Sequence, residues 1–428
     1  MKKAVISNRI YISVDDKLKK EISKELTYKI PPRIPTDPPE IIKTVTRVRT
    51  DLLSIPVGRM DLIPQDYEIV DKRVNKPVEF PEFKFDLRPA QKEVHDDIVD
   101  NCIINAWTSW GKTFTGIAIA AKLGQKTLVV VHTTNLRNQW AIEVEKTLGI
   151  KPGIIGSGKC EIDSPIVIGN TQSLYRKLDI IRKEFGTIIL DEMHHVSSPT
   201  FSRIVDSNFA KYKIGLSGTI ERKDGKHVVF RDYFGPKVYQ PPKENYMTPT
   251  IDIVKSDIRF LDGKMPWANK INQLASNEDY VRLITFLAGA YAKKGHKVLV
   301  VSDRVKFLKA VAEGLGDIAV CVTGEVDQDE RIRLHELVAT SPKIKVLCGM
   351  QSIYSEGISI DPLSALILAT PINNNPLLTQ LIGRVIRECE DKIPPKIVDI
   401  HLKGNTSRNQ ASNRMGYYIQ QGYQIREL

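Results

Sequence analysis

The sequence predicts an α/β protein in which two parallel-sheet domains follow a small α+β module. Short runs rich in valine and isoleucine alternate with helical segments, and this alternation begins again after a looser stretch at residues 241–275. Strands of that composition are buried on both faces, which is typical of a parallel sheet covered by helices. The length of 428 residues also exceeds that of one ordinary domain, so two or three domains are expected.

Residues 1–85 are predicted to form the α+β module. Two β-like runs, Arg9–Val14 and Ile41–Val48, lie on either side of a proline-rich break that begins at Ile30. The proline-containing stretch Pro77–Pro81 marks the linker to the next domain. The module holds 17 Lys and Arg residues against 13 Asp and Glu residues, so it is mildly basic.

The two α/β domains are expected at residues 86–245 and 246–428. In the first, a helix at Gln91–Val99 precedes a short apolar strand at Cys102–Ala106, and a helix of small apolar residues follows at Thr113–Leu123. The other strands expected in the first domain are Thr127–His132, Ile166–Ile168 and Thr187–Leu190. Those expected in the second domain are Lys297–Val301, Ile318–Val322, Lys345–Cys348 and Ala365–Leu368.

Charge and composition favour a nucleic-acid partner and argue against a membrane protein. The formal net charge of +11 and the pI near 9.2 suit a polyanionic partner. No apolar run approaches the roughly 18 residues that a membrane span needs, and the first residues carry charges too early for a signal peptide. The five cysteines are far apart and form no CxxC pair, which argues against zinc or disulfides and fits a reducing cytoplasm.

A phosphate-binding loop is predicted directly after the first strand of the first α/β domain. Residues Ala106–Thr113 match the pattern strand–[AG]xxxxGK[ST]–helix, with alanine in the place of the usual first glycine. In such a loop backbone N–H groups wrap the phosphates of ATP, Lys112 reaches the β and γ oxygens, and the Thr113 hydroxyl holds Mg²⁺. The alternative, an incidental Gly-Lys-Thr at a helix start, is disfavoured by the strand before it and the helix after it. The residues expected to bind nucleotide here are Thr108, Ser109, Trp110, Gly111, Lys112 and Thr113.

Two acidic residues, Asp191 and Glu192, follow the predicted strand Thr187–Leu190. A parallel sheet presents its functional loops at the carboxyl ends of its strands, so these carboxylates are expected beside the phosphate loop. Asp191 would hold Mg²⁺, through water, and Glu192 would orient and deprotonate the attacking water. The alternative is a pair of solvated acids in an ordinary turn.

The order of the motifs along the chain resembles that of superfamily 2 DExH helicases. Asp191–His194 resembles motif II of this family, and Gln380–Arg387 reads QxxGRxxR, which resembles motif VI. The other segments that resemble family motifs are Leu87–Gln91, Val131–Trp140, Gly169–Leu174, Ser217–Thr219, Val300–Arg304, Thr323–Glu325 and Ser355–Ile360. Several of these are generic singly, but their collective order and spacing are improbable by chance. The resemblance implies two RecA-like domains that hydrolyse ATP between them while moving on nucleic acid.

This resemblance also implies roles for residues outside the phosphate loop and the acid pair. Arg88 and Gln91 would contact adenine, and Gly357 would lie at the nucleotide. The residues that would couple hydrolysis to domain movement are His194, Ser217 and Thr219. The residues that would contact the nucleic-acid strand are Thr133, Arg137, Thr171, Gln172, Ser302, Arg304, Thr323 and Ser355.

Arg384 and Arg387 have a physical reason to act on ATP. They are three positions apart, so on a helix they project from neighbouring positions on one face. Charge that develops on a transferring phosphoryl group needs a cation that arrives when the site closes, and a planar guanidinium suits this task. We therefore expect the second domain to complete the catalytic set with Gln380, Arg384 and Arg387. The alternative is two solvated arginines on an exposed helix.

A finer resemblance is to the XPB-like and phage UvsW-type helicases. The segment Glu356–Ile360 and the compact plan suggest the phage members, and Leu53–Arg59 resembles a segment that such proteins carry, with Val57 and Arg59 departing from it. The resemblance implies forked or junction DNA as substrate, 3′ to 5′ movement, a role in phage DNA replication, recombination or repair, and a place in the host cytoplasm. A monomer is expected because one chain contains both halves of the ATP site.

The module at residues 1–85 is expected to recognise the shape of the DNA. Its basic residues after the proline-rich break would contact a second duplex arm, and they are Arg47, Arg49, Arg59, Lys72 and Arg73. In this interpretation the module is not required for ATP turnover. The alternative is a packing domain that only shields the first sheet.

Two other functions stay open at the level of sequence. The motifs do not distinguish DNA from RNA, because contacts of a motor to its strand go largely to phosphates. A clamp whose ATPase serves as a timer, without strand separation, would carry the same motifs, whereas a metabolic kinase would need neither QxxGRxxR nor a second sheet. The turn Glu221–Lys226 and the stretch Met265–Lys270 are the candidates for a strand-separating wedge.

Overall fold

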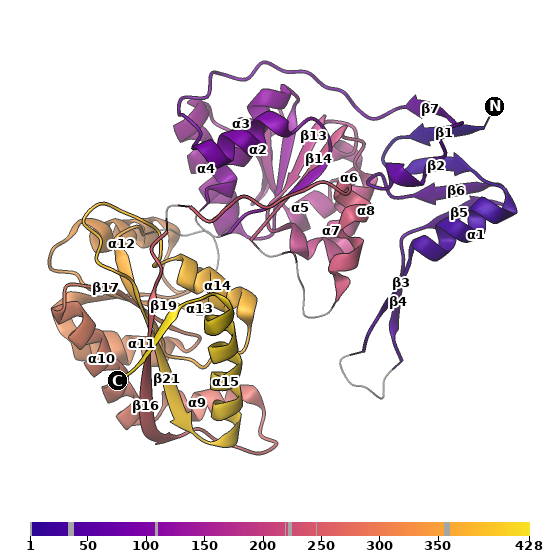
Figure 1. The fold of residues 1–428 in the computed structure, drawn as a ribbon. Helices are drawn as coiled ribbons and strands as arrows, with labels where there is room; N and C mark the ends of the chain where they lie inside the picture. The colour runs from indigo at the N-terminus through magenta and orange to yellow at the C-terminus, as the bar shows by residue number, and fades with distance from the viewer. Residues whose placement is uncertain are drawn as a thin grey trace. The chain divides into compact units, whose positions relative to one another are not determined.

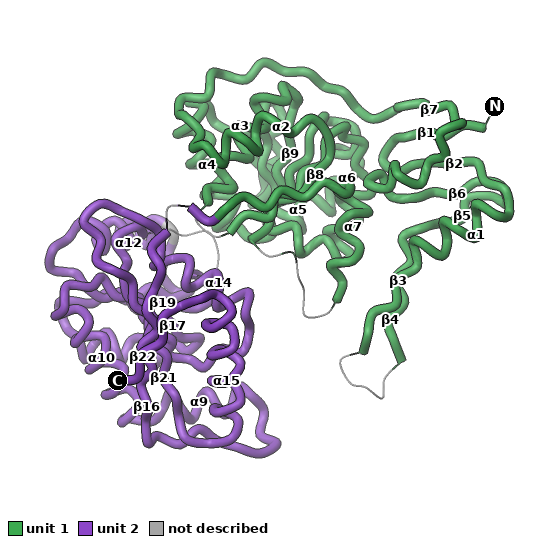
Figure 2. The backbone as a smooth tube through the Cα atoms, in the orientation of Figure 1, with its two compact units in different colours: residues 1–242 green, residues 243–428 purple. Residues whose placement is uncertain are grey.

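The computed structural model describes residues 2–32, 38–107, 110–218, 220, 225–244, 246–354 and 360–428. The chain divides into two compact units, Met1–Pro242 and Lys243–Leu428, shown in green and purple in Figure 2. Each unit has a parallel sheet and hydrophobic clusters of its own. Within the described ranges, no helix has the length and apolar character that crossing a membrane demands.

Unit 1 contains the first parallel sheet, with the strand order β11-β10-β12-β9-β13-β14-β8-β15 (Figure 1). Its strands are β8 (Cys102–Asn105), β9 (Thr127–Val131), β10 (Gly153–Gly156), β11 (Lys159–Cys160), β12 (Ile166–Asn170), β13 (Thr187–Leu190), β14 (Tyr212–Ser217) and β15 (Val238–Tyr239). Its main helices are α2 (Pro89–Asp97), α3 (Lys112–Leu123), α4 (Thr134–Leu148), α5 (Thr171–Tyr175), α6 (Leu178–Ile181), α7 (Pro199–Ser207) and α8 (Phe230–Phe234). The strands pair in parallel, except that β11 runs antiparallel to β10.

Burial on both faces explains why these strands read as continuous apolar runs. Every residue of β9 is buried, and its side chains alternate between two hydrophobic clusters. Val129 and Val131 join the cluster that includes α3 and α4, whereas Leu128 and Val130 join the cluster that includes α7 and α8. Helices therefore cover both faces of the sheet and leave its carboxyl edge to the loops.

The N-terminal module also belongs to unit 1. Its mixed sheet has the order β5-β6-β2-β1-β7, and a separate hairpin joins β3 to β4. The elements are β1 (Lys3–Ile6), β2 (Ile10–Ser13), α1 (Asp16–Glu25), β3 (Thr27–Ile30), β4 (Glu40–Lys43), β5 (Thr46–Arg49), β6 (Leu52–Ile55) and β7 (Glu68–Asp71). The prediction of one β-like run at Ile41–Val48 is wrong, because the run divides between the hairpin and the sheet. The break falls at the buried Thr44, whose hydroxyl donates to Asp232 Oδ2 at 2.6 Å.

A buried carboxylate, Asp232, joins the module to the first parallel sheet domain. It lies on α8, is fully buried and accepts hydrogen bonds from Tyr28 Oη at 2.9 Å and from Arg59 Nη1 at 3.4 Å, besides Thr44. Burial raises the pKa of Asp232, and the hydrogen bonds from Thr44, Tyr28 and Arg59 oppose that shift. Arg59 is itself only 1% exposed and also pairs with Asp61 at 2.9 Å.

This network corrects the predicted set of DNA-contacting arginines. The prediction is wrong for Arg59, because its guanidinium is enclosed between the module and α8. The Arg73 side chain is only 9% exposed, and it already forms an ion pair with Asp71 at 2.7 Å. Arg47 and Arg49 lie on β5, where all residues are exposed, and Lys72 is exposed as well.

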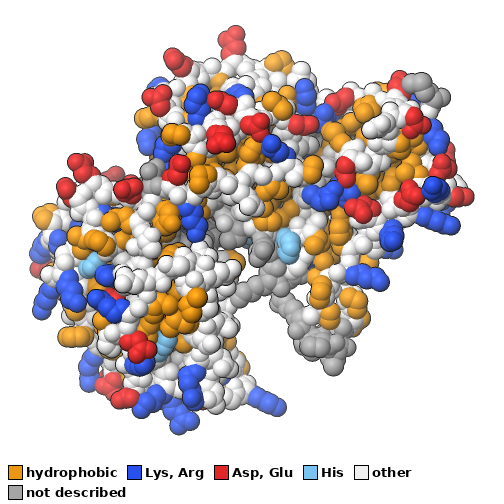
Figure 3. Space-filling model, in the orientation of Figure 1, with side chains coloured by type: hydrophobic (Ala, Val, Ile, Leu, Met, Phe, Trp, Pro, Cys, Tyr) orange, Lys and Arg blue, Asp and Glu red, His pale blue; other side chains and the backbone are white. Residues whose placement is uncertain are grey.

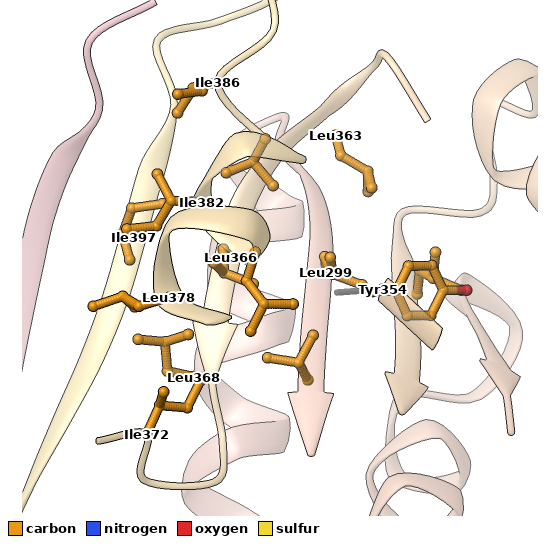
Figure 4. Packing of buried hydrophobic residues seen from close by; sticks show 14 of the residues in the cluster. Leu299, Tyr354, Leu363, Leu366, Leu368, Ile372, Leu378, Ile382, Ile386 and Ile397 are labelled. Atoms are coloured by element: carbon orange, nitrogen blue, oxygen red, sulfur yellow. The ribbon is translucent and has the colours of Figure 1, made fainter. Parts of the chain in front are cut away.

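Unit 2 contains the second parallel sheet, with the order β18-β19-β17-β20-β21-β16-β22. Its strands are β16 (Thr250–Arg259), β17 (Lys297–Ser302), β18 (Ala319–Val322), β19 (Val346–Met350), β20 (Leu363–Leu368), β21 (Lys396–Lys403) and β22 (Gln424–Glu427). Its helices are α9 (Trp267–Ala275), α10 (Glu278–Lys293), α11 (Val305–Leu315), α12 (Gln328–Thr340), α13 (Gln351–Tyr354), α14 (Asn375–Gly383) and α15 (Asn405–Gln420). Figure 4 shows one face of its core, where Leu299, Leu366 and Ile397 from neighbouring strands meet Leu378 of α14.

A buried ion pair fixes the last long helix of unit 2. Arg414 of α15 binds both oxygens of Asp399 on β21, at 2.8 and 2.6 Å, and both side chains are at most 4% exposed. Tyr418 Oη donates to the same carboxylate at 3.0 Å. Burial alone would raise the pKa of Asp399, but the charge of Arg414 outweighs it and lowers the pKa to about 2. The predicted fold, two parallel-sheet α/β domains after a small α+β module, is confirmed.

The buried position of Arg59 predicts a large cost for its removal. Arg59→Met leaves the enclosed Asp232 without its cationic partner, so the free energy of unfolding should fall by roughly 3–5 kcal/mol. The matched control is Arg231→Met, because Arg231 pairs with Asp61 at 2.9 Å but its side chain is 46% exposed. The control should cost less than about 1 kcal/mol. Urea denaturation of the two variants measures the difference, and equal losses would show that Arg59 does not fix the module.

Candidate ATP-hydrolysis site

Parallel strand pairing brings three loops of unit 1 to one edge of its sheet. Strand β13 pairs with β14 through Leu190 and Gly215, and β14 pairs with β8 through Ser217 and Asn105. The residues that follow β8, β13 and β14 therefore lie next to one another. These are the phosphate loop, the acid pair and the segment that begins at Ser217, as parallel topology dictates.

Glycine is required at position 111 of the phosphate loop. Gly111 has φ of +90°, a left-handed conformation, and a Cβ atom there would lie 2.6 Å from Gln91 Nε2. Helix α3 begins at the next residue, so its free N–H groups point toward the loop. Lys112 Nζ donates to the carbonyl of Ala106 at 3.1 Å, across the loop in which phosphates would lie. The loop is thus built for an anion.

Trp110, the bulky departure from the usual loop pattern, is fully buried. Its indole belongs to the hydrophobic cluster between the sheet and helices α3 and α4. Its carbonyl accepts hydrogen bonds from Gln91 Nε2 at 2.8 Å and from Arg88 Nη2. Trp110 therefore anchors the loop to the core, and Arg88 and Gln91 hold its backbone from α2. Their predicted contact with adenine stays a prediction.

Asp191 is held by Trp140, a residue to which the sequence motifs assign no role. Trp140 of α4 donates its indole N–H to Asp191 Oδ2 at 2.8 Å, and the backbone N–H of Glu192 donates to Oδ1 at 3.0 Å. Asp191 is 4% exposed. Burial and the neighbouring charge of Glu192 raise its pKa, and the Trp140 hydrogen bond opposes the shift. Sequence gives little signal for this contact, because Trp140 looks like any core residue of an amphipathic helix.

Glu192 is in a different electrostatic environment from Asp191. Its backbone has φ of +50°, which is uncommon for a residue with a side chain and turns the chain sharply after β13. Burial would raise its pKa, but the contact with His194 and the charge of Lys112 outweigh burial and lower it. The His194 Nδ1 atom lies 3.3 Å from Glu192 Oε2. Glu192 is thus ionised at neutral pH, as a base that takes a proton from water must be.

His194 also connects the acid pair to the end of β14. Its Nδ1 atom lies 3.2 Å from the hydroxyl of Ser217, besides its contact with Glu192. A change in the position of Glu192 can therefore be passed to the segment after β14 through one side chain. This geometry suits the predicted coupling role of His194 and Ser217, which stays a prediction, and Thr219 lies outside the described residues.

The donors at this edge fit a magnesium ion that is shared with a nucleotide. In the described part of the chain there is no cluster of three or more His, Cys, Asp or Glu side chains that could hold a metal by itself. The ligands that we expect for the ion are the Asp191 carboxylate and the Thr113 hydroxyl. This fits Mg²⁺, which typically binds one or two protein carboxylates and fills its other positions with phosphate oxygens and water. When bound, the ion would neutralise charge that develops on the phosphates.

The predicted catalytic residues of unit 2 lie on and after α14. Gln380 is part of α14 and Arg384 follows its last residue. Arg384 Nε donates to the carbonyl of Tyr354 at 3.0 Å, and Arg387 Nη1 pairs with Asp361 Oδ1 at 2.9 Å. The prediction that both arginines project from one face of a helix is wrong, because α14 ends at Gly383, before Arg384 and Arg387. Both side chains are partly exposed, and their action on ATP stays a prediction. Action on ATP requires Arg387 to exchange its pairing with Asp361 for one with phosphate.

Four of the seven predicted strand-contacting residues that the structure describes are buried. Thr133 caps α4, and Arg137 is 7% exposed and donates to Asn170 Oδ1 at 3.1 Å. The other buried members are Thr171, Ser302 and Thr323. Thr133 and Arg304 are partly exposed, and Gln172 is exposed. The buried members can shape a binding loop without touching the strand, and their roles stay predictions.

Several predicted residues lie outside the described residues. They are Thr108, Ser109, Thr219, Ser355 and Gly357. Residues 221–224 of the first wedge candidate, Glu221–Lys226, also lie outside them. The second wedge candidate, Met265–Lys270, is described and leads into α9.

One parallel sheet carries a phosphate loop beside an acid pair, and the same chain contains a second parallel sheet. This combination is typical of motor ATPases of the RecA-like class. A family model described as "Type III restriction enzyme, res subunit" matches residues 84–222, and "Helicase conserved C-terminal domain" matches residues 278–389. The crystal structure of the Pyrococcus furiosus Hef helicase domain covers 76% of this chain and 97% of its own, with a TM-score of 0.52 and 13% identity, which supports the fold.

Three curated relatives define the family more closely. "Probable helicase D10" of Escherichia phage T5 is 41% identical over 429 residues, 98% of this chain and 95% of the relative. A protein of Acanthamoeba polyphaga mimivirus, L396, carries a provisional name as an ATP-dependent RNA helicase and is 28% identical over 97% of this chain and 84% of its own. "ATP-dependent DNA helicase uvsW" of Enterobacteria phage T4 is 26% identical over 74% of this chain and 68% of its own.

The chain belongs to the superfamily 2 helicases, in the group that contains the phage UvsW-type and XPB-like enzymes. It is an enzyme that uses ATP to drive a helicase reaction on nucleic acid.

The geometry around Glu192 predicts a separation of nucleotide binding from hydrolysis. Glu192→Gln removes the base but keeps the shape and the contacts of the loop, so ATP binding should persist while turnover falls by roughly two or more orders of magnitude. Lys112→Ala should lose nucleotide affinity and turnover together. Steady-state ATPase assays and nucleotide titrations measure both effects.

The matched control for Glu192→Gln is Glu145→Gln, the same exchange at an exposed position of α4. It should leave turnover unchanged. Near-normal turnover in Glu192→Gln would remove Glu192 from the role of base.

Proposed function

We propose that this helicase acts on DNA, that it unwinds or branch-migrates forks and junctions, and that it moves 3′ to 5′ along one strand. The support for DNA is the group to which the chain belongs, where the UvsW relative is named a DNA helicase. Phage DNA replication, recombination or repair is the setting that this group suggests, and the host cytoplasm is its place. We expect the enzyme to work as a monomer with Mg²⁺ as the cofactor of ATP.

The proposed division of labour has three parts. Residues 1–85 recognise DNA structure, residues 86–245 bind and hydrolyse ATP, and residues 246–428 supply the second RecA-like domain. In this proposal Asp191 and Thr113 hold Mg²⁺, and Lys112 and Glu192 carry hydrolysis. Gln380, Arg384 and Arg387 act on the phosphates from the second domain when the site closes.

The observation that carries the proposal of branched DNA is the surface of β5 in the N-terminal module. All four residues of β5 are exposed, and among the described residues neither the Arg47 nor the Arg49 side chain has an ion-pair or hydrogen-bond partner. Figure 3 shows lysine and arginine side chains interspersed with acidic ones on the surface of this part of unit 1. The buried Arg59–Asp232 contact fixes the module to the ATP-binding domain. A basic strand held in a fixed position can contact a duplex arm beside the tracked strand.

Two other functions are supported by specific observations. The mimivirus relative carries the name of an RNA helicase, so an RNA substrate is the first alternative. A clamp whose ATPase acts as a timer is the second, because every residue of the hydrolysis site would serve a clamp equally well.

Unwinding assays with matched substrates separate these functions. We expect ATP-dependent strand separation on forked and four-way DNA junctions, and weaker separation on a tailed DNA duplex. Preferential unwinding of a forked RNA duplex would favour the RNA alternative. ATP turnover without strand separation on any substrate would favour the clamp.

The exposed arginines of β5 predict a change in the salt dependence of junction binding. Replacing Arg47 and Arg49 together with alanine should reduce the log–log slope of junction affinity against salt by about one unit for each lost phosphate contact. The preference for a junction over a tailed duplex should fall as well. Competition binding at several salt concentrations measures both quantities.

The control is a double variant in which Arg282 of α10 and Arg333 of α12 are replaced by alanine. It makes the same change in charge at two exposed positions of unit 2. It should leave the junction preference unchanged. An unchanged slope and preference in the β5 variant would leave the module with a packing role.

A further inference from the structure

A cavity of about 360 Å³ opens at the carboxyl edge of the second parallel sheet. This volume lies in the range of small-ligand sites, roughly 300–1,000 Å³. The cavity lies where β17, β19 and β20 end, between α9, α14 and α15. Its lining includes Trp267, Asp303, Gln351, Thr370, Asn374 and Gln410. The wall therefore combines one large aromatic ring with several amide groups.

Two glutamine side chains in this wall have amide atoms without partners. Gln410 of α15 is 8% exposed, and among the described residues its Oε1 atom accepts no hydrogen bond. The Nε2 atom of Gln351, at the start of α13, is buried and donates none within the same residues. An unpaired buried polar group lowers the stability of the fold, so it needs a reason to be retained. One unpaired acceptor and one unpaired donor line the same cavity.

The rim of the cavity is fixed before any ligand arrives. Arg414, held by Asp399, donates to the carbonyl of Ile372 at 3.0 Å. The hydroxyls of Ser302 and Thr370 lie 2.8 Å apart and join β17 to the end of β20. A rigid wall lowers the entropy cost of ordering a ligand.

Trp267 provides a flat apolar surface beside these amides. Trp267 is 41% exposed, and its ring packs against the buried Phe260, with ring centroids 5.6 Å apart. Arg304 ties the first turns of α9 to the rim, because its guanidinium donates to Asn272 Oδ1 at 2.6 Å and to the carbonyl of Ala268 at 3.2 Å. An exposed tryptophan on a fixed support is the usual platform for a stacked base.

The charges of the wall favour the base of a nucleotide over its phosphate. No lysine or arginine is among the described residues that line the cavity, and the carboxylate that Asp303 contributes is paired with Arg304 at 3.0 Å. A phosphate is therefore disfavoured inside the cavity. An uncharged ring with both hydrogen-bond donors and acceptors on its edge fits the stacking surface and the two amides, which describes a nucleobase.

We propose that this cavity binds one unstacked base of the nucleic-acid strand, with the base stacked on Trp267 and its edge bonded to Gln351 and Gln410. The proposal rests on the nucleic-acid substrate of the family and adds a base contact to a motor expected to hold phosphates. It assigns a role to the stretch Met265–Lys270 that differs from a strand-separating wedge.

The test compares a short mixed-sequence DNA strand with the same strand made abasic, by fluorescence anisotropy with the full chain. Trp267→Ala should weaken binding of the base-containing strand about 5- to 100-fold and change binding of the abasic strand little, at an unchanged salt slope. Trp267→Phe keeps a ring and should recover most of the loss. Phe286→Ala, an exposed aromatic on α10, is the matched control and should have no effect on either strand.

A second variant separates binding from folding. Gln410→Leu keeps the volume of the side chain and removes an unpaired buried group, so the free energy of unfolding should not fall. Affinity for the base-containing strand should nevertheless fall about 2- to 10-fold. The proposal is overturned if both variants bind the base-containing strand normally, or if they weaken the two strands equally. Free adenosine that binds with Trp267-dependent quenching but does not compete with the strand would also overturn it. None of these results depends on whether forks or junctions are unwound.

Discussion

Parallel alignment of the strands in the first sheet is the constraint on which the ATP site depends. Because β8, β13 and β14 all run in one direction, the phosphate loop, the acid pair and Ser217 meet at a single edge although they are far apart in sequence. The helices cover both faces of this sheet, so the loops that connect strands and helices lie at its edges. Chemistry at that edge follows from topology before any single side chain is considered.

Burial and neighbouring charges give the two acids at this edge, Asp191 and Glu192, different properties. Asp191 is enclosed and held by Trp140, so its carboxylate is positioned for a cation, whereas the contacts with His194 and Lys112 keep Glu192 ionised. The same principle acts away from the site, where Asp232 fixes the N-terminal module and Asp399 fixes α15. Each of these buried carboxylates has a cation or several hydrogen-bond donors beside it, as burial of a charge requires. Enclosed acids thus connect elements of the fold at Asp232 and Asp399, besides the acid pair to which we assign catalysis.

Sequence predicted the sheets and the motif positions because both depend on local pattern. Runs such as Thr127–Val131 are apolar throughout, and Gly111 and Lys112 fall at a fixed spacing after a strand. Local sequence patterns do not predict contacts between residues that are distant in sequence. Nothing in the sequence near Arg59 shows that it meets Asp232 across 173 positions, so the sequence wrongly predicts a DNA contact there. The sequence likewise gives no sign of the hydrogen bond from Trp140 to Asp191. The burial of Trp110 between the sheet and helices α3 and α4 likewise depends on residues that are distant in sequence.

The central claim is that hydrolysis at the edge of the first sheet is coupled to nucleic acid. The most direct measurement is the steady-state rate of ATP turnover with and without a saturating single strand of DNA, at constant magnesium and salt. The account predicts slow turnover by the free protein and a severalfold or larger increase with the strand, because the strand favours the closed state in which the second domain acts on the phosphates. Equal rates with and without the strand would contradict it.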